Sequence, residues 1–541
     1  MTPVHYFAFA ASRPAEVCLN ERVDRWLPWA LVLLAGVVRV LRWTQTAVMM
    51  NDGPTFLRLA GYASHGDFTS LLRHPFHPLY PLAIAAAKPL FGDAERAAVA
   101  ISVLAGALAV GALYLLLRAA FDRRVAAIGA FLLAVHASAL ELTDLQSDAL
   151  YLALFLASAA LLWRAYAAGS ARLAFAAGLV AGFAYLTRPE GLGTLVVGVA
   201  LCALEVARRH WSVSQAARIG GALVLGGVLV MSPYVAFLSA RSGGLVLTGK
   251  KSVTGVLGLS AVRAWLSTGS PEYQPPKPLD PLLAERPDLV RPEKGVKPFR
   301  VAPVTHGFAK YPGALVRLGR SARKALRAEI LVLLALGLWS ARGRPGARGR
   351  FFGTYALLYA FVLFGLAANS GYVSRRHVFP PAALCFGYAA LGVLALADGL
   401  GRLPRVGARL APAARLALPL VLVAGLGLGK ALRPDRMNAL PELRAAYWVR
   451  DQGGLAPDQA VAAIKQRVGY YAQARFVDLR RAPHEALLLP FLRRERARYV
   501  VVDESERTEL LRMLGADATA LAPVHEEREG EDAAFVFEVR G

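Results

Sequence analysis

Long runs of apolar residues alternate with short polar segments along the first 430 residues. A helix needs about 20 mostly apolar residues to cross a bilayer, so runs near this length predict transmembrane spans. Eleven spans are predicted in this way, at about 26–41, 97–117, 125–140, 149–166, 173–185, 191–207, 219–238, 328–339, 351–368, 378–396 and 410–428. The predicted fold class is an α-helical polytopic membrane protein.

Arginine clusters follow every second predicted span, near 118–124, 164–172, 208–218, 342–350 and 402–409. Cytoplasmic loops carry the excess of Lys and Arg, so these loops are predicted to be cytoplasmic, with the N-terminus inside and the C-terminus outside. The first span lacks a small-residue cleavage pattern and is expected to stay as an anchor. Arg39 and Arg42 beside it are expected to snorkel to the interface.

Two of the predicted outer loops are long, at 47–95 and 240–327. In the first, the segments 55–64 and 79–91 are too short to span and predict helices that lie along the membrane interface. The second is rich in proline between 271 and 303 and predicts an irregular loop, a candidate lid.

The composition turns polar after residue 430. Short β-rich runs at 460–464, 498–503 and 534–539 alternate there with helical patterns at 442–450, 485–496 and 504–514. We therefore predict a transmembrane domain over 1–430 and a small α/β extracytoplasmic domain over 431–541.

Composition agrees with the membrane assignment, since 56% of the 541 residues are hydrophobic and the mean hydropathy is +0.41. The net charge of +24 comes from arginines in short loop clusters rather than on one face. This distribution is typical of residues that set the orientation of membrane spans and not of a nucleic-acid-binding surface. The bilayer is the expected partner. Cys18, Cys202 and Cys385 lack metal-ligand spacing, so neither a disulfide framework nor a zinc site is predicted.

Polar residues that suit chemistry gather on the predicted outer side, whereas the inner side carries only arginine clusters. They are Asp52, His74, His77, Asp144, Asp148, Arg188, Glu190, Lys250, Lys251, Arg375, Arg376 and His377. Carboxylates with convergent arginines at an apolar interface suit a reaction between a hydroxyl and an anionic lipid-bearing substrate, because arginine binds phosphate bidentately. Asp52 is the first candidate, since it stands just past the first span, where a carboxylate has no obvious structural role.

Several short motifs carry a resemblance to a known family. They are Asn51-Asp52-Gly53-Pro54, Arg73-His74-Pro75-Phe76-His77-Pro78-Leu79-Tyr80-Pro81, Ser147-Asp148-Ala149-Leu150-Tyr151, Ala184-Tyr185-Leu186-Thr187-Arg188-Pro189-Glu190-Gly191 and, more weakly, Arg375-Arg376-His377-Val378-Phe379-Pro380. The chain resembles the GT-C superfamily of membrane glycosyltransferases, in particular the branch of protein O-mannosyltransferases and lipid A aminoarabinose transferases.

The resemblance implies transfer of a sugar from a polyprenyl phosphate to an acceptor hydroxyl of a glycolipid, polysaccharide or protein. It places this reaction on the outer face of a bacterial inner membrane, with inversion at the anomeric carbon. It maps the catalytic base onto Asp52, a second acid onto Asp148 and a contact with the donor phosphate onto Arg188. Further substrate-binding candidates are His74, His77, Tyr80, Glu190, Lys250, Arg375 and Arg376. No metal ligands are assigned, and a divalent cation stays an option.

The single acid of Asn51-Asp52 stands where protein O-mannosyltransferases typically show an acidic pair, which disfavours a protein acceptor. Structural alternatives stay open for most candidates: Asp52 and Asp148 as helix caps, Arg188 as an interface anchor, and His74 with His77 as a turn cap or metal pair. A transporter or flippase of lipid-linked glycans is the alternative function, although no internal repeat supports it. A third hypothesis, compatible with either function, treats the C-terminal domain as a separate module that binds a glycan or a partner.

Overall fold

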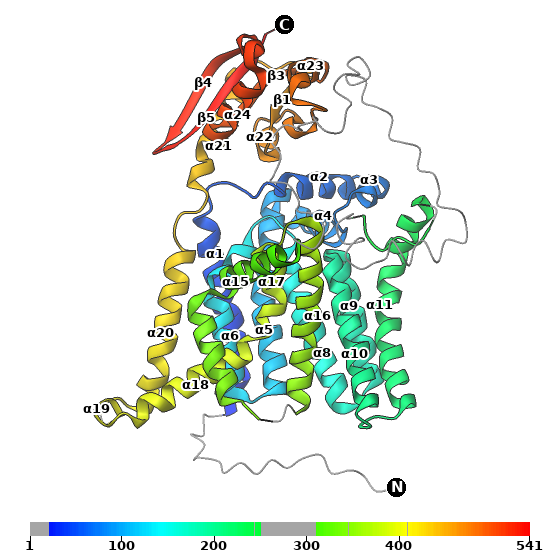
Figure 1. Ribbon diagram of the computed structural model, residues 1–541, viewed down its shortest axis with the longest axis vertical. Helices are drawn as coiled ribbons and strands as arrows, with labels where there is room; N and C mark the ends of the chain where they lie inside the picture. Colours follow the sequence, from blue (N-terminus) through cyan, green and yellow to red (C-terminus); the bar gives the residue numbers. More distant parts are fainter. Residues whose placement is uncertain (1–20, 243, 250–309, 344–345, 408, 541) are drawn as a thin grey trace.

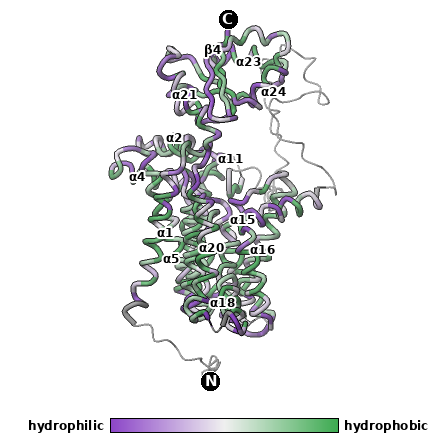
Figure 2. The backbone as a smooth tube through the Cα atoms, turned by 90° about the vertical axis from the view of Figure 1, so that its left-hand side faces the viewer, coloured by the Kyte–Doolittle hydropathy of each residue, from purple (hydrophilic) through white to green (hydrophobic). Residues whose placement is uncertain are grey.

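The computed structural model describes residues 21–242, 244–249, 310–343, 346–407 and 409–540 (Figure 1). A bundle of helices forms the larger part, and a small sheet with its helices stands beyond one end of the bundle. Figure 2 shows hydrophobic residues concentrated along the bundle helices, with hydrophilic residues at the two ends of the bundle. The described residues therefore have the predicted fold class, a helical membrane protein with a small C-terminal α/β unit.

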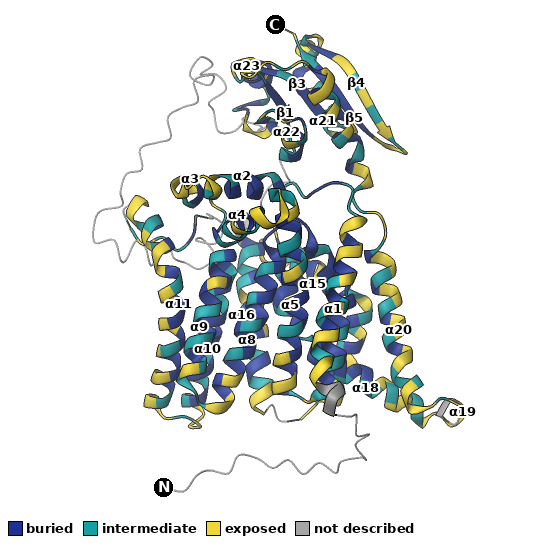
Figure 3. Ribbon diagram, turned by 180° about the vertical axis from the view of Figure 1, so that it is seen from behind, coloured by how far each residue is buried: buried dark blue, intermediate teal, exposed yellow. Residues whose placement is uncertain are grey.

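The longer helices of the bundle are α1 (Glu21–Thr44), α5 (Ala94–Ala120), α6 (Arg123–Val135), α8 (Asp148–Ala168), α9 (Ala171–Thr187), α10 (Leu192–Ala207), α11 (Val213–Ser242), α15 (Lys310–Ser340), α16 (Ala347–Ser370), α18 (Phe386–Arg402) and α20 (Pro412–Ala431). Shorter helices connect them: α7 (Ala137–Leu140), η1 (Glu141–Thr143), η2 (Pro189–Gly191), α17 (Arg375–Ala383) and α19 (Pro404–Gly407). Figure 3 shows α5 and α8 largely buried and α20 more exposed at the periphery.

Seven of the described helices are long and apolar enough to cross a membrane, or up to nine if two bent pairs each count as one span. The pairs are α6 with α7 and η1, bent by 60°, and α17 with α18, bent by 66°. The sequence predicts about eleven spans, and all eleven segments are helical. The difference lies in 173–185, inside the 17-residue α9, and in 328–339, which follows a break in α15 at Arg327.

Helix α9 nevertheless packs closely within the bundle, beside α8, α10 and α11 (Figure 1). A Cβ on Gly178 would lie 2.0 Å from the carbonyl oxygen of Leu223 in α11, and one on Gly226 would lie 2.3 Å from that of Phe175. Small residues at such contacts let helix backbones approach in a membrane, where packing rather than hydrophobicity drives association.

Two short helices, α2 (Gly53–Ser64) and α4 (Leu79–Phe91), match the predicted helical segments 55–64 and 79–91 and lie over the end of the bundle that faces the C-terminal unit (Figure 1). A third, α3 (Phe68–Arg73), has six residues and was not predicted, because so short a segment has no helical periodicity to detect. This layer carries the loop that leads to Asp52.

The prediction that Arg39 and Arg42 snorkel is wrong. Arg39 is fully buried against α5, where Gly106 leaves the room that its side chain occupies, and Nη1 donates to the Ala35 carbonyl at 3.0 Å. Arg42 is also buried and pairs with Asp435 at 2.6 Å. Both side chains therefore lie inside the protein, and Arg42 connects α1 with the segment after α20.

The C-terminal unit is built on a five-stranded sheet of order β2-β1-β3-β5-β4. Its strands are β1 (Ala460–Ala463), β2 (Arg475–Asp478), β3 (Ala497–Asp503), β4 (Leu521–Glu529) and β5 (Asp532–Val539), and its helices are η5 (Met437–Ala439), α21 (Leu440–Gln452), α22 (Gln466–Tyr471), η6 (Leu479–Arg481), η7 (Glu485–Leu487), α23 (Leu488–Arg494), α24 (Glu504–Leu514) and η8 (Gly515–Ala520). Strands β2, β1 and β3 run parallel, β5 runs antiparallel to β3, and β4 pairs antiparallel with β5.

The three predicted strands match β1, β3 and β5, whereas β2 and β4 were not predicted. Strand β2 has four residues of which one is buried, and β4 ends in a run of charged residues with mostly exposed or half-buried positions. Neither strand has the apolar alternation by which half-buried strands are recognised.

Lys465, just after β1, is surrounded by acids in this unit. Its Nζ lies 2.9 Å from Asp503 and 3.3 Å from Glu506, and it also contacts Glu442, which in turn pairs with Arg467 at 2.9 Å. Burial alone would lower the pKa of Lys465, but the neighbouring carboxylates outweigh it, so the pKa is raised. The ammonium group is thus the shared counterion of several partly buried acids.

Lys465→Met is expected to destabilise the C-terminal unit by about 3 kcal/mol, because it leaves those carboxylates without their counterion. Hydrogen exchange of the β1 and β3 amides in the intact protein measures the loss. Arg496→Met is the matched control, since Arg496 pairs with Asp458 at 2.6 Å in a well-exposed position, where an ion pair contributes little. Equal exchange rates in the two variants would contradict the assigned role of Lys465.

Candidate active site

The predicted acids and arginines meet where four segments end at the outer side of the bundle. Asp52 precedes α2, and Pro54 near the start of that helix favours the turn into it. Asp148 is the first residue of α8, and Arg188 lies between α9 and η2, where Pro189 follows. Arg376 stands in the first turn of α17, which Ser374 and His377 cap reciprocally.

These side chains form one continuous chain of charges. Arg376 Nη1 lies 3.5 Å from Asp52 Oδ2 and 3.7 Å from Asp148 Oδ2. Arg188 Nη1 lies 2.6 Å from Asp148 Oδ1, and Arg188 Nη2 lies 3.1 Å from Glu190 Oε1. Five residues from four segments of the sequence thus alternate in sign, from Asp52 at the surface to Glu190 inside.

Asp52 and Asp148, two of the three acids of this chain, occupy different environments. The Asp148 side chain is 2% exposed and engaged by two arginines, whereas the Asp52 side chain is 39% exposed. Asp52 stands at the N-cap position of α2, but its side chain makes no capping hydrogen bond there. Capping therefore does not account for an acid at this position, and Asp52 is the most exposed carboxylate of this chain of charges.

Arg188 and Glu190 are held deep in the site. Arg188 is buried, and its guanidinium lies 5.9 Å from the centre of the Tyr151 ring. The Tyr359 hydroxyl donates to the Glu190 carbonyl at 2.9 Å. Arg188 is thus a fixed support for Asp148, and its polar edge already faces the carboxylates of Asp148 and Glu190.

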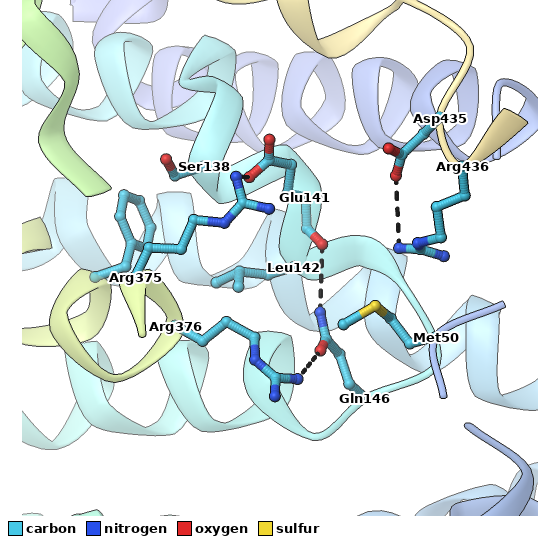
Figure 4. Close-up of a pocket in the computed structure, with 10 residues that line it drawn as sticks. Met50, Ser138, Glu141, Leu142, Gln146, Arg375, Arg376, Asp435 and Arg436 are labelled. Atoms are coloured by element: carbon cyan, nitrogen blue, oxygen red, sulfur yellow. Dashed lines mark hydrogen bonds and ion pairs between the residues drawn. The ribbon is translucent and has the colours of Figure 1, made fainter. Parts of the chain in front are cut away.

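A pocket opens next to the Asp52–Arg376 pair (Figure 4). It is lined by Met50, Ser138, Glu141, Leu142, Gln146, Arg375, Arg376, Phe379, Asp435 and Arg436. Arg376 Nη1 donates to Gln146 Oε1 at 2.5 Å, and Arg375 pairs with Glu141. Figure 4 shows Arg375 and Arg376 reaching toward Glu141 and Gln146 from one side and Arg436 beside Asp435 on the other, so guanidinium groups stand on both sides of the pocket.

The histidines and the tyrosine of the first outer loop lie elsewhere. Buried His77 contacts the Tyr185 carbonyl at 2.5 Å and Thr248 Oγ1 at 3.1 Å. Buried Tyr80 donates to the Ala98 carbonyl at 3.2 Å, and the ring of His74 accepts from the Phe76 amide at 3.1 Å. The structure does not bring these three side chains to the pocket, and their contacts hold the outer layer in place.

Two further predictions concern the loop that carries Lys250 and a possible metal site. Lys250, and the region of the predicted lid between 250 and 309, lie outside the described residues. Across the ranges that are described, no group of three or more His, Cys, Asp or Glu side chains is arranged to hold a metal ion.

Sequence reasoning missed Gln146 and Arg436 as site residues. Gln146 lies in the short predicted outer loop before Asp148. Its side chain is uncharged, so a search for charged residues beside apolar runs does not find it. Arg436 follows the last span on the predicted outer side, and its only signal was a positive charge where the positive-inside rule does not expect one.

The chain is similar to one known family and to several solved structures. Residues 73–237 match the family model described as dolichyl-phosphate-mannose-protein mannosyltransferase. The apo oligosaccharyltransferase of Archaeoglobus fulgidus is similar in structure, with a TM-score of 0.59 at 14% identity over 94% of this chain and 74% of that one. ArnT from Cupriavidus metallidurans in the apo state has a TM-score of 0.53 at 14% identity over 94% of this chain and 97% of that one. A search of curated proteins finds no match.

A third solved structure is the oligosaccharyltransferase AglB from Archaeoglobus fulgidus in complex with an inhibitory peptide and a dolichol-phosphate. Its TM-score is 0.52 at 13% identity, over 95% of this chain and 74% of that one. The protein is a multi-pass membrane protein with the GT-C glycosyltransferase fold. The likeness to these structures, at 13–14% identity, confirms the fold that the short motifs predicted, and the mannosyltransferase family model matches residues 73–237.

Proposed function

We propose that the protein is an inverting glycosyltransferase that moves a monosaccharide from a polyprenyl phosphate to an acceptor hydroxyl. The observation that supports this best is the exposed Asp52 carboxylate beside an arginine-lined pocket, in a fold shared with an oligosaccharyltransferase that was solved with a dolichol-phosphate. We place the protein in a bacterial inner membrane, with the site on the periplasmic side. The transmembrane domain is proposed to end near residue 430, where the C-terminal domain begins.

Asp52 acts as the general base in this mechanism. The acceptor hydroxyl attacks the anomeric carbon from the face opposite the phosphate, and its proton passes to the Asp52 carboxylate. The bond between the anomeric carbon and the phosphate oxygen breaks, and the electron pair leaves with polyprenyl phosphate. A phosphate is a weak base, so its departure needs charge stabilisation rather than a proton.

Arg376 and Arg375 are the groups proposed to stabilise that charge. Their side chains are 23% and 43% exposed and line the pocket, whereas the guanidinium of Arg188 is buried between Asp148 and Glu190. Preorganised positive groups in a partly dehydrated site favour the charge that develops on a leaving phosphate. Arg188 and Asp148 are then positioning residues that orient Arg376, and the donor phosphate is expected in the pocket.

The test is sugar transfer by the purified full-length protein in lipid nanodiscs. Polyprenyl phosphates carrying labelled hexoses and pentoses are offered with envelope glycolipid, polysaccharide or peptide acceptors, and acceptor-dependent release of polyprenyl phosphate is measured. Product with the inverted anomeric configuration supports the proposal. If liposomes show the lipid-linked sugar crossing the bilayer without any transfer product, the flippase alternative replaces it.

A further inference from the structure

The backbone that leads to Asp52 is held by a segment from the far end of the transmembrane part. The Asp435 amide donates to the Gln45 carbonyl at 2.9 Å, and the Ala47 amide donates to the Asp435 carbonyl at 3.2 Å. These bonds make an isolated parallel β-bridge between Thr46 and Asp435. The connection between α20 and the C-terminal unit thus runs alongside the connection between α1 and α2.

Arg436 continues this contact toward the catalytic base. Its guanidinium donates to the Val48 carbonyl and pairs with Asp144. Asp144 accepts in turn from the Met50 amide at 3.4 Å and from the Leu145 amide at 2.6 Å. Arg436 therefore ties the chain two to four residues before Asp52 to the loop that precedes Asp148.

The C-terminal unit adds contacts of its own on the same stretch. The Met49 amide donates to the Tyr471 hydroxyl at 3.1 Å, and Thr55 in α2 donates to Gln466. Backbone groups at Gln45, Ala47, Val48 and Met49 before Asp52, and the Thr55 hydroxyl after it, are thus bonded to residues beyond α20.

The backbone conformation at Arg436 indicates that this position needs the arginine side chain. Its φ of 57° and ψ of 31° are left-handed, a conformation that costs a non-glycine residue about 1 kcal/mol and that glycine adopts freely. A turn needed only for its shape would favour glycine. A strained arginine is retained where its side chain does something that glycine cannot do.

We propose that Asp435, Arg436 and Tyr471 form a strap that positions Asp52, with Arg436 as its central positioning residue. The C-terminal unit is then part of the catalytic machinery through the strap, rather than a separate binding module. The inference rests on the proposed function for the role of Asp52, but the ordering of residues 46–52 by the strap does not depend on it.

Arg436→Gly tests the strap in the full-length protein. Glycine suits the left-handed backbone, but it leaves the buried Asp144 carboxylate without its arginine, so thermal stability is expected to fall, while amide exchange of Ala47, Met49 and Met50 rises at least tenfold relative to amides elsewhere in the protein. The value of kcat is expected to fall about 100-fold with little change in donor KM, since a displacement near 1 Å is enough for such a loss. Arg436→Lys restores part of the rate, because one ammonium group cannot serve Val48 and Asp144 together as a guanidinium does.

Arg209→Gly is the matched control, because Arg209 has a φ of 59° in an exposed turn at the predicted cytoplasmic side. It is expected to leave both exchange and kcat unchanged. Should Arg436→Gly fail to fold, Tyr471→Phe removes only the acceptor for the Met49 amide and is expected to raise exchange at that amide with a smaller loss of kcat.

Unchanged exchange at 46–52 in Arg436→Gly would overturn the strap, and so would faster exchange with an unchanged kcat. If the wild-type protein transfers no sugar from any donor, the proposed function fails, and the exchange result alone then decides whether the strap exists.

Discussion

Asp52→Asn is expected to lower kcat about 1,000-fold, the loss typical of removing a general base. Asparagine has nearly the same shape but cannot accept the proton of the acceptor hydroxyl. The described contact of the Asp52 side chain is the ion pair with Arg376 at 3.5 Å, and asparagine is as good an N-cap as aspartate, so folding is expected to persist. The measurement is single-turnover transfer from the lipid-linked donor, with donor affinity determined separately by direct binding.

Asp67→Asn is the matched control for this prediction. Asp67 lies in the same outer layer, and its side chain caps α3 by accepting from the Ser70 amide at 3.0 Å. Its replacement is expected to leave transfer unchanged. If Asp52→Asn transfers sugar at more than a tenth of the wild-type rate, Asp52 is not the base.

Arg376→Gln is expected to lower kcat by about 100-fold to 1,000-fold, the range found when one preorganised charge-stabilising donor is removed. Arg376 reaches Asp52, Asp148 and Gln146 with one guanidinium and also faces the pocket. Its loss removes positive charge from the leaving phosphate and leaves two carboxylates near each other without their shared cation. Donor affinity is expected to fall as well, since the same group binds the phosphate before the reaction.

Arg376→Lys separates charge from geometry. A lysine retains the charge but lacks the planar fork that reaches several acceptors at once, so it is expected to recover less than a tenth of the wild-type rate. Arg96→Gln is the control, because Arg96 forms an exposed pair with Asp93 at 3.1 Å, where little energy is at stake. A kcat of Arg376→Gln within twofold of wild type would place the phosphate away from this pocket.

The acids and arginines of the site could be predicted because their cost is visible in sequence. Asp52, Asp148 and Arg188 each stand at the edge of a long apolar run, where a charge is expensive unless it is paired or functional. The structure brings these three into one chain of charges. The sequence could not show which of the two acids is exposed. That difference, between the exposed Asp52 and the buried Asp148, is the basis for assigning them different roles.

His77 and Tyr80 illustrate the opposite case. Both stand in a polar, proline-rich motif that suits a loop that binds substrate and equally a loop that is held in place by hydrogen bonds to the rest of the protein. The hydrogen bonds of His77 to Tyr185 and Thr248 depend on chain segments 108 and 171 residues away. No local pattern reports such contacts, so the motif alone could not distinguish support from substrate binding.

The order of apolar runs and arginine clusters by itself determined the helical membrane fold, the outer layer of short helices and the α/β character of the C-terminal unit. Those features follow from how much apolar surface each segment must bury, which is a local property of the chain. Only the tertiary structure decided that Arg39 is buried, that Gln146 and Arg376 meet beside the pocket, and that Arg436 reaches Val48 across 388 residues. Such pairings depend on which helices lie side by side, and the energy of each contact is gained only after packing has brought the two segments together.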